Sequence, residues 1–357
     1  MKILGTGIIF TRGQGISVLE NSLRNGWVKP SEIDVPRTEG RTRPVYQVDL
    51  DAVQDRSLLK KLRRADKLSK MSVLAAADAL ADCGIADITR KKIGIILATA
   101  FGAQVTTFDF LDGILDYGDA GVSPTTFSNS VHNAAASYVS SSLNIQGPTL
   151  TITQFRFSFQ SALQLAQTWL EQGRCDYLLV GAVDQYGDVL GYIAEQKLTT
   201  AQDGRIKPFT FNPTCQVPGE GALFFLLGSD QSDSAYCSID SVSTSGDPDS
   251  GKLVDINLID ADGLLPDESA YLSALTPDTL TTAYAPIFGS MMIGGAFNLA
   301  AAALMLKQQT HYAAPVQDNP HALLLLSETR PAHIGSIRSI GCNCFGEQSV
   351  VYLSKLT

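Results

Sequence analysis

A strand-to-helix elbow in the middle of the sequence has the geometry that many enzymes use to present a nucleophile. Residues 151–153 are β-branched (Thr-Ile-Thr) and run, with hardly a turn residue between, into a helix-period apolar pattern that includes Leu163. A small nucleophilic side chain at such a helix N-terminus lies near free backbone N–H groups and the helix dipole, which stabilise an anion. The tip reads Phe155-Arg156-Phe157 instead. The sequence therefore places a cation between two aromatic rings where a nucleophile is expected.

The composition indicates a globular protein with a large core and restricts its partners. The chain has 357 residues, of which 45% are apolar and 18% charged. We find neither a signal-peptide pattern nor an apolar run long enough to span a bilayer, so we expect a cytoplasmic protein. The net charge of −9 argues against nucleic acid as a main partner. Six cysteines lack metal-ligand spacing, and we expect them to be reduced core thiols: Cys83, Cys175, Cys215, Cys237, Cys342 and Cys344.

Predicted strands and helices alternate along the chain, which is typical of a layered α/β fold. In the first part, strands are predicted at 2–10, 92–98, 149–153, 177–183 and 222–227, and helices at 71–82 and 158–171. After a polar segment near Asp247, strands follow at 255–259, 322–326, 337–342 and 349–353, with a helix at 295–307. The restarted pattern suggests an internal duplication. We predict an N-terminal half at 1–232 and a C-terminal half at 233–357 that pack as one body.

Five segments together resemble the β-ketoacyl synthase branch of the thiolase-fold superfamily, in family order and over nearly the whole chain. They are residues 63–80 (an early helix), 123–153 (the dimer-interface helix and the strand before the nucleophile), 175–185 (the strand after the nucleophile helix), 207–227 (an "RPFD…GEGA"-like segment) and 341–353 (a closing loop). The resemblance implies a thiolase-like α/β fold, layered αβαβα and built from two duplicated halves. It also implies an obligate dimer.

The resemblance allows the catalytic positions to be compared one by one. A ketosynthase of this family uses a cysteine to carry the acyl chain as a thioester, and two histidines to assist decarboxylation of malonyl groups. Similarity of residues 162–166 to the helix after the nucleophile puts the cysteine position on Arg156, and a guanidinium cannot be acylated. The first histidine position falls on Asp262. At two of the three catalytic positions, a cation (Arg156) and an anion (Asp262) thus replace the cysteine and the first histidine.

The remaining catalytic positions are also replaced. The hydroxyls that hold the carrier's pantetheine arm in the family correspond to residues 264–266, which read Leu-Leu-Pro. The second histidine position falls on Ser290 or Met292, depending on where a one-residue gap is placed. None of the four histidines lies at a catalytic position: His132, His311, His321 and His333. We therefore interpret the chain as a pseudo-ketosynthase without the Cys-His-His triad, a cofactor of its own or a metal site.

Within the family, this description fits the chain-length-factor-like subunits. Such a subunit forms a heterodimer with an active ketosynthase and shapes the shared acyl tunnel in type II polyketide or fatty-acid-like biosynthesis. The partner uses phosphopantetheine-linked acyl chains on an acyl carrier protein, and the complex would be a β-ketoacyl-[acyl-carrier-protein] synthase. The short chain and bulky elbow favour the subunits of aryl-polyene clusters. Two alternatives are residual malonyl decarboxylation or acyl transfer, with Arg156 holding an oxyanion, and a homodimeric scaffold.

The side chains at the elbow have two interpretations each. Arg156 either drifted and pairs with some nearby carboxylate, or forms an internal ion pair with Asp262 that fills the old active site. Three phenylalanines either pack in the core or line the partner's tunnel. They are Phe155, Phe157 and Phe159, and in the tunnel interpretation they act together with Phe127 and His132 from the interface segment.

A basic segment, residues 60–70, stands out against the acidic background. It is either a solvated helix start or a docking site for an acidic acyl carrier protein, which opposite charge would favour. The docking candidates are Lys60, Lys61, Arg63, Arg64 and Lys67. Cys215 could be a displaced nucleophile, but no histidine lies near it in the sequence.

Overall fold

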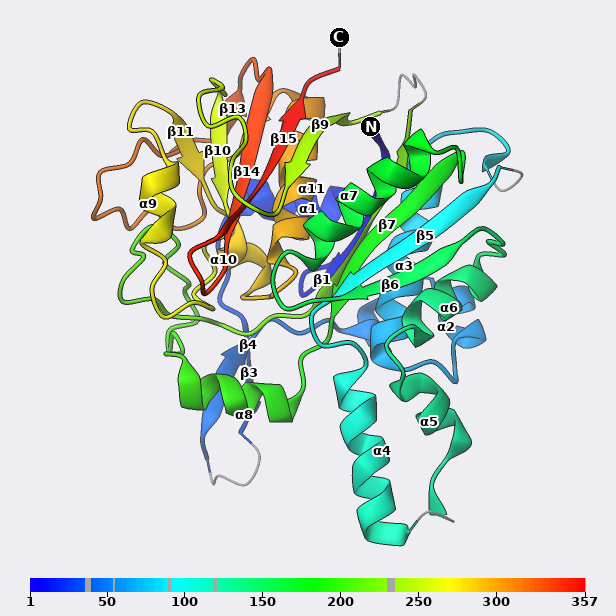
Figure 1. The fold of residues 1–357 in the computed structure, drawn as a ribbon. Coiled ribbons are helices and arrows are strands. Elements are labelled where there is room, and N and C mark those ends of the chain that lie inside the picture. Colours follow the sequence, from blue (N-terminus) through cyan, green and yellow to red (C-terminus); the bar gives the residue numbers. More distant parts are fainter. Residues whose placement is uncertain (36–39, 54, 89–90, 119–120, 230–234, 357) are drawn as a thin grey trace.

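The computed structural model describes residues 1–35, 40–53, 55–88, 91–118, 121–229 and 235–356 (Figure 1). Within these residues, one 11-stranded sheet joins the two halves of the fold. In the N-terminal half the strands lie in the order β6 (Thr149–Thr153), β5 (Ile93–Thr99), β7 (Tyr177–Asp184), β8 (Gly221–Gly228) and β1 (Lys2–Phe10). The short β2 (Gly13–Gln14) pairs with β1.

The C-terminal half repeats this arrangement. Its strands lie in the order β11 (Leu280–Thr282), β10 (Ile256–Ile259), β14 (Ser336–Cys342), β15 (Gln348–Ser354) and β9 (Cys237–Ser243). Numbered within each half, both runs read 3-2-4-5-1, with parallel pairs at the 3-2-4 end and antiparallel pairs at the 4-5-1 end. The halves meet where β1 pairs with β9. The predicted boundary at 232/233 lies outside the described residues.

Three hydrophobic clusters fill the space between the layers of helices and strands. Helices α3 (Lys67–Asp82) and α6 (Ala134–Ser142) cover the outer face of the N-terminal strands. Helices α7 (Ser158–Glu171) and α11 (Gly294–Gln308) lie between the two halves, and their apolar residues pack against strands of both. Helix α9 (Ala270–Ala274) lies on the outer face of the C-terminal strands. This order of helices and strands is the predicted αβαβα layering.

The other elements surround this body. Helices α4 (Gln104–Tyr117) and α5 (Pro124–Ser130) extend away from it as an arm, and α8 (Asp188–Lys197) lies beside the hairpin of β3 (Ser31–Asp34) and β4 (Thr42–Val45) (Figure 1). The shorter elements are α1 (Ile16–Asn25), η1 (Leu50–Ala52), α2 (Arg56–Lys61), α10 (Ala285–Phe288), β12 (Thr310–His311) and β13 (Arg330–Pro331). Among the described residues, no helix combines the length and apolar character that crossing a membrane requires.

Two sequence predictions fail in the body. Residues 322–326 form no strand; only Leu325 makes an isolated bridge, to Thr281. The side chain of Asn319 bonds both the N–H (3.0 Å) and the carbonyl (2.8 Å) of Leu323, which competes with a sheet ladder. The cysteines are all free thiols, but Cys215 is half-buried and Cys344 is exposed, so these two are not core residues.

Candidate functional site at the elbow

The elbow is a strained connection that turns Arg156 into the molecule. Strand β6 ends at Thr153 and helix α7 begins at Ser158. The residue before the helix, Phe157, has a left-handed backbone with φ of 65°. That conformation costs a bulky residue on the order of 1–3 kcal/mol and persists only where its surroundings fix it. The Phe157 ring is buried, and the Arg156 side chain is only 8% exposed.

Arg156 pairs with two carboxylates that follow strand β10. Its Nη2 atom donates to Asp262 Oδ1 at 2.9 Å, and its Nη1 atom lies 3.8 Å from Asp260 Oδ2. The predicted contact between Arg156 and Asp262 is therefore confirmed. Sequence reasoning missed Asp260, although its position two residues before Asp262, just after a buried strand, was a usable signal. The pair joins one half of the duplicated fold to the other.

A third carboxylate completes a buried charge cluster, which we define as Arg156, Asp260, Asp262 and Glu268. Glu268 Oε1 accepts from the backbone N–H of Asp262 (3.2 Å) and of Gly263 (2.9 Å), which orients the Asp262 loop. Each of the four charged side chains is at least nine-tenths buried. Three carboxylates thus share one guanidinium in a place with little water.

The pKa values of the cluster follow from this imbalance. Burial and then the charge of Asp262 raise the pKa of Asp260 to about 7, and the same two causes raise the pKa of Glu268 well above its ordinary value. Burial alone would lower the pKa of Arg156, but the attraction of Asp262 and Asp260 outweighs it and leaves the pKa above its usual range. Burial therefore favours the protonated forms of Asp260 and Glu268 beside this one cation.

The segment before helix α11 contacts the Asp262 loop of this cluster. Ser290 Oγ donates to the backbone carbonyl of Asp262 and accepts from the N–H of Val217 at 3.0 Å. Ser290 thus fixes the Asp262 loop through its main chain. Met292, the other residue suggested for that position, is half-buried and borders a cavity.

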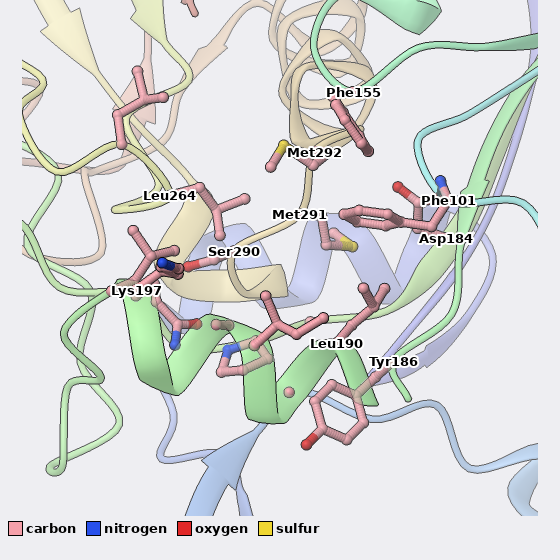
Figure 2. A pocket seen from close by; sticks show the side chains of 18 of the residues that line it. Phe101, Phe155, Asp184, Tyr186, Leu190, Lys197, Leu264, Ser290, Met291 and Met292 are labelled. Atoms are coloured by element: carbon pink, nitrogen blue, oxygen red, sulfur yellow. Dashed lines mark hydrogen bonds between the residues drawn. The ribbon is translucent and has the colours of Figure 1, made fainter. Parts of the chain in front are cut away.

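That cavity has a volume of about 410 Å³ and brings most of the predicted positions together. Its wall includes Phe155, Arg156, Ser290, Met292 and residues 264–266. Helix α8 closes the opposite side with Leu190, Ile193 and Ala194. Figure 2 shows Phe155, Leu264 and Met292 on one side of this space and Leu190 on the helix opposite. The wall is mainly apolar, so the site suits an apolar guest more than an ionic one.

The phenylalanines at the elbow divide between the two interpretations. Phe155 is 65% exposed, borders the cavity and stacks at a tilt on Phe101 with ring centroids 5.6 Å apart, so the core interpretation is wrong for it. Phe157 and Phe159 are buried, and Phe159 packs on Phe225 at 5.9 Å. Their burial supports the core interpretation for Phe157 and Phe159.

The two interface candidates lie elsewhere. Phe127, on α5, is 56% exposed and contacts Phe110 of α4 at 5.4 Å between centroids. His132 is exposed in the turn between α5 and α6, beside Gly102. Both lie outside the cavity wall that the described residues form, and both belong to the surface of the arm.

The basic segment is also divided. Lys60, Lys61, Arg63 and Arg64 are exposed on and after helix α2, as a docking site or a solvated helix requires. Lys67 is different, because its ammonium contacts the fully buried carboxylate of Glu220. We therefore remove Lys67 from the docking candidates, because its ammonium group is already paired with the carboxylate of Glu220.

Asp184, at the end of strand β7, is a buried acid of the cavity wall that sequence reasoning missed. Its Oδ1 atom accepts from Thr99 Oγ1 (2.8 Å) and from the N–H of Ala100 (3.0 Å), and burial raises its pKa to about 6. An acid at the end of a strand, after seven buried residues, was the available signal. Cys215, which the sequence suggested as a displaced nucleophile, is half-buried and has no histidine among its contacts in the described part of the chain. Among the described residues, no group of three or more His, Cys, Asp or Glu side chains is arranged to hold a metal ion.

Comparisons with known proteins agree with this picture. Residues 2–232 match the family model described as "Beta-ketoacyl synthase, N-terminal domain". The 3-oxoacyl-[acyl-carrier-protein] synthase 2 of Staphylococcus aureus is 26% identical over 266 residues. That match covers 69% of this chain and 62% of the relative, less than two thirds of its length.

Solved structures resemble the whole chain. The ishigamide ketosynthase/chain length factor superposes with a TM-score of 0.80 at 16% identity, covering 100% of this chain and 99% of that one. A chain from the complex between a type II polyketide synthase acyl-carrier protein and its ketosynthase gives a TM-score of 0.79 at 15% identity. That match covers 99% of this chain and 99% of the solved one. A β-ketoacyl synthase from Burkholderia phymatum gives 0.78 at 15%, with full coverage. At these identities the likeness establishes the fold.

We expect Arg156 and Asp262 to be energetically coupled. Arg156→Ala leaves buried carboxylates without their cation and should lower the free energy of unfolding by about 3–5 kcal/mol. The double variant with Asp262→Ala should lose about 1–3 kcal/mol less than the sum of the two single losses. Urea unfolding of the four proteins measures the coupling. Additive losses would mean that the contact carries no pair energy.

We also expect Asp260 to make the fold pH-dependent. Because its folded pKa of about 7 lies above that of an unfolded aspartate, the folded state binds more protons, and stability falls as pH rises through 7. Asp260→Asn keeps the shape but removes this titration. Between pH 6 and 8.5 the parent should lose about 1 kcal/mol more stability than the variant. The exposed Asp188→Asn serves as the control and should parallel the parent; equal slopes in all three proteins would refute the assignment.

Proposed function

The chain belongs to the β-ketoacyl synthase family, and we propose that it is a non-catalytic, chain-length-factor-like subunit that pairs with an active ketosynthase. In this proposal the pair works in type II polyketide or fatty-acid-like biosynthesis, and this chain shapes the acyl tunnel. Aryl polyenes are the product class that we propose. The chain needs no cofactor of its own, because the acyl chains travel on the phosphopantetheine arm of a carrier protein.

The observation that carries the proposal is that Arg156 is buried and paired with two carboxylates. Its guanidinium is buried, lies at the elbow tip and contacts both Asp262 (2.9 Å) and Asp260 (3.8 Å). A nucleophile that carries an acyl group is a thiol or hydroxyl that loses its proton, whereas a paired guanidinium neither loses its proton nor attacks a carbonyl. An oxyanion beside this cation would be repelled by the two carboxylates that it contacts, although the Nε–H of Arg156 has no hydrogen-bond partner among the described residues. The geometry therefore favours a retired site over residual acyl transfer.

The cavity wall supports the same conclusion. Residues 264–266 present Leu-Leu-Pro to the cavity, so the hydroxyls that the family resemblance leads us to expect are missing at these positions. A pantetheine arm carries amide groups, which lose their hydrogen bonds to water when they enter an apolar channel without new partners. A carrier arm would therefore enter this subunit at a cost, and would enter an active partner instead.

Two exposed surfaces suit a partner subunit. Strand β6 is an edge strand, with β5 as its neighbour in the described sheet, and its Leu150 side chain is 42% exposed. The α4–α5 arm exposes apolar side chains as well: Leu111 (45%), Leu115 (82%), Tyr117 (75%) and Phe127 (56%). Unprotected edge strands and clustered exposed apolar groups mark association surfaces. We assign this face to the ketosynthase; a homodimer of this chain would use the same face, and sizing with and without a ketosynthase separates the two.

The exposed cations after helix α2 are the docking candidates for a carrier protein. Lys60, Lys61, Arg63 and Arg64 carry four positive charges against the net charge of −9 of the chain. Attraction between exposed charges is screened by salt. We expect carrier binding to weaken severalfold between 50 and 300 mM salt and to weaken again when Arg63 and Arg64 become glutamine. Binding that ignores both changes would leave only the solvated-helix interpretation.

We predict that Phe155 affects product length and that Phe159 affects stability. Phe155→Ala opens the cavity at an exposed side chain, so it should lengthen the product of the complex while changing the unfolding free energy by less than about 1 kcal/mol. Phe159→Ala, the matched buried change, should cost about 3–5 kcal/mol. Product profiling by mass spectrometry and urea unfolding measure the two effects. Unchanged product length in Phe155→Ala would remove the tunnel role.

The proposed function is tested by co-purifying the chain with candidate ketosynthases from the same cell and assaying condensation. We expect a one-to-one complex that condenses malonyl units, with no turnover by this chain alone. Turnover of malonyl carrier protein by the isolated chain would overturn the non-catalytic role. Loss of that turnover in Arg156→Ala would then assign the chemistry to the elbow.

A further inference from the structure

The α4–α5 arm carries acidic side chains and no cation. Residues 93–155, which include the whole arm and the edge strand β6, contain neither lysine nor arginine. Helix α4 carries Asp109, Asp112 and Asp116, and all three are exposed. Within the described part of the chain, none of these three carboxylates has an ion-pair partner. The negative charge of the arm is therefore not neutralised inside this subunit.

The three acids form a stripe along one side of α4, which we call the acidic stripe. Residues three or four positions apart are neighbours on a helix surface, and the spacings here are three (Asp109 to Asp112) and four (Asp112 to Asp116). Like charges at these spacings repel each other and destabilise the helix that carries them. The acidic stripe thus has a cost in the free subunit, which favours a use outside the fold of this chain.

An exposed apolar stripe runs beside the acidic one. Phe108 (36% exposed), Leu111 (45%) and Leu115 (82%) share one side of α4, and each is followed in the sequence by one of the three acids. The acids therefore lie about 100° further round the helix. Another side of α4 is already used, because Phe110 contacts Phe127 of α5. A partner that covers the apolar stripe meets the acids at the rim of the contact.

A second copy of this chain fits that surface poorly. A two-fold dimer brings the same patch of both copies together, so two arms would bring carboxylates from both sides and no cation from residues 93–155. Arg64 is exposed near the base of the arm, where its carbonyl accepts from Asn129 Nδ2 at 2.8 Å. Helix α4 runs away from the body (Figure 1) and carries Asp116 about 18 Å along its axis from the first helical residue.

We propose that the acidic stripe of α4 selects the partner of this subunit by charge. It keeps two copies of this chain apart, and it fits a ketosynthase that presents lysine or arginine side chains beside an apolar surface. Opposite charges favour the correct pair, and like charges disfavour the wrong one. The inference rests on the proposed function for the ketosynthase, but the exclusion of a second copy is measured on this chain alone.

The first test measures self-association of the isolated full chain by sedimentation. The parent should be monomeric at micromolar concentration in 50 mM salt. The triple variant Asp109→Asn, Asp112→Asn, Asp116→Asn should dimerise at least tenfold more tightly, because the neutral amides remove the repulsion between the arms. Salt at 500 mM screens the same repulsion and should strengthen self-association of the parent. A parent that is already a stable dimer in 50 mM salt would overturn the proposal.

A matched control separates the acidic stripe from net charge. The triple variant Asp249→Asn, Asp278→Asn, Glu328→Gln removes three exposed acids from the C-terminal half and has the same net charge as the α4 variant. It should stay as monomeric as the parent. Urea unfolding should be alike in all three proteins, because only exposed side chains are changed. Equal self-association of the two variants, or an α4 variant that remains monomeric, would refute the exclusion of a second copy.

The second test measures binding to a ketosynthase that co-purifies with the chain. The α4 variant should bind about tenfold more weakly than the parent and the control variant, and binding of the parent should weaken between 50 and 500 mM salt. Equal binding of the α4 variant and the parent would overturn the charge selection. If no ketosynthase binds the parent, the proposed function fails instead, and the sedimentation result still decides whether the acidic stripe keeps two copies apart.

Discussion

The structure depends on one buried constraint: a guanidinium at the elbow that must be neutralised where water does not reach. Arg156 comes from the connection between β6 and α7 in the first half of the fold, and Asp260 and Asp262 come from the end of β10 in the second. Removing any of these charges leaves the others unbalanced, so the two halves are held in a fixed relation at this point. The backbone contacts of Glu268 and Ser290 to the Asp262 loop serve the same purpose. A mobile or solvated arginine would have left the site open to chemistry.

This constraint links the fold to the function that we propose. In both halves the strands run 3-2-4-5-1, and α7 and α11 fill the layer between them. The scaffold therefore keeps the strained turn at Phe157, which orients whatever residue precedes the helix. In the function that we propose, the ion pair stands in place of a nucleophile and the scaffold supplies shape: a mainly apolar cavity on one side and an edge strand with an apolar arm on another. A subunit that sets the length of a partner's product needs these features and no catalytic group.

Sequence reasoning reached the layered fold from patterns that are local in the chain, and it reached the contact between Arg156 and Asp262 from the family resemblance, which implies that these two positions converge. Strands at 2–10 and 149–153 and the helix at 158–171 are uninterrupted apolar or periodic runs, and they match the structure residue by residue. It missed what depends on packing between distant segments. Phe155 and Phe159 look alike in the sequence, yet one is 65% exposed and the other 1%, because the turn at Phe157 sends them to opposite sides. The engagement of Lys67 by Glu220, 153 residues away, has no local signal either.

The central claim is that the elbow no longer carries an acyl group, and intact-mass measurement of both subunits tests it most directly. The purified complex would be incubated with an acyl-loaded carrier protein, quenched and separated, and each chain weighed. The account predicts that the mass of one acyl group is added to the ketosynthase alone and that this chain keeps its unmodified mass. An acyl adduct on this chain would contradict the account, and peptide mapping would show whether Cys215, Cys344 or another residue holds it.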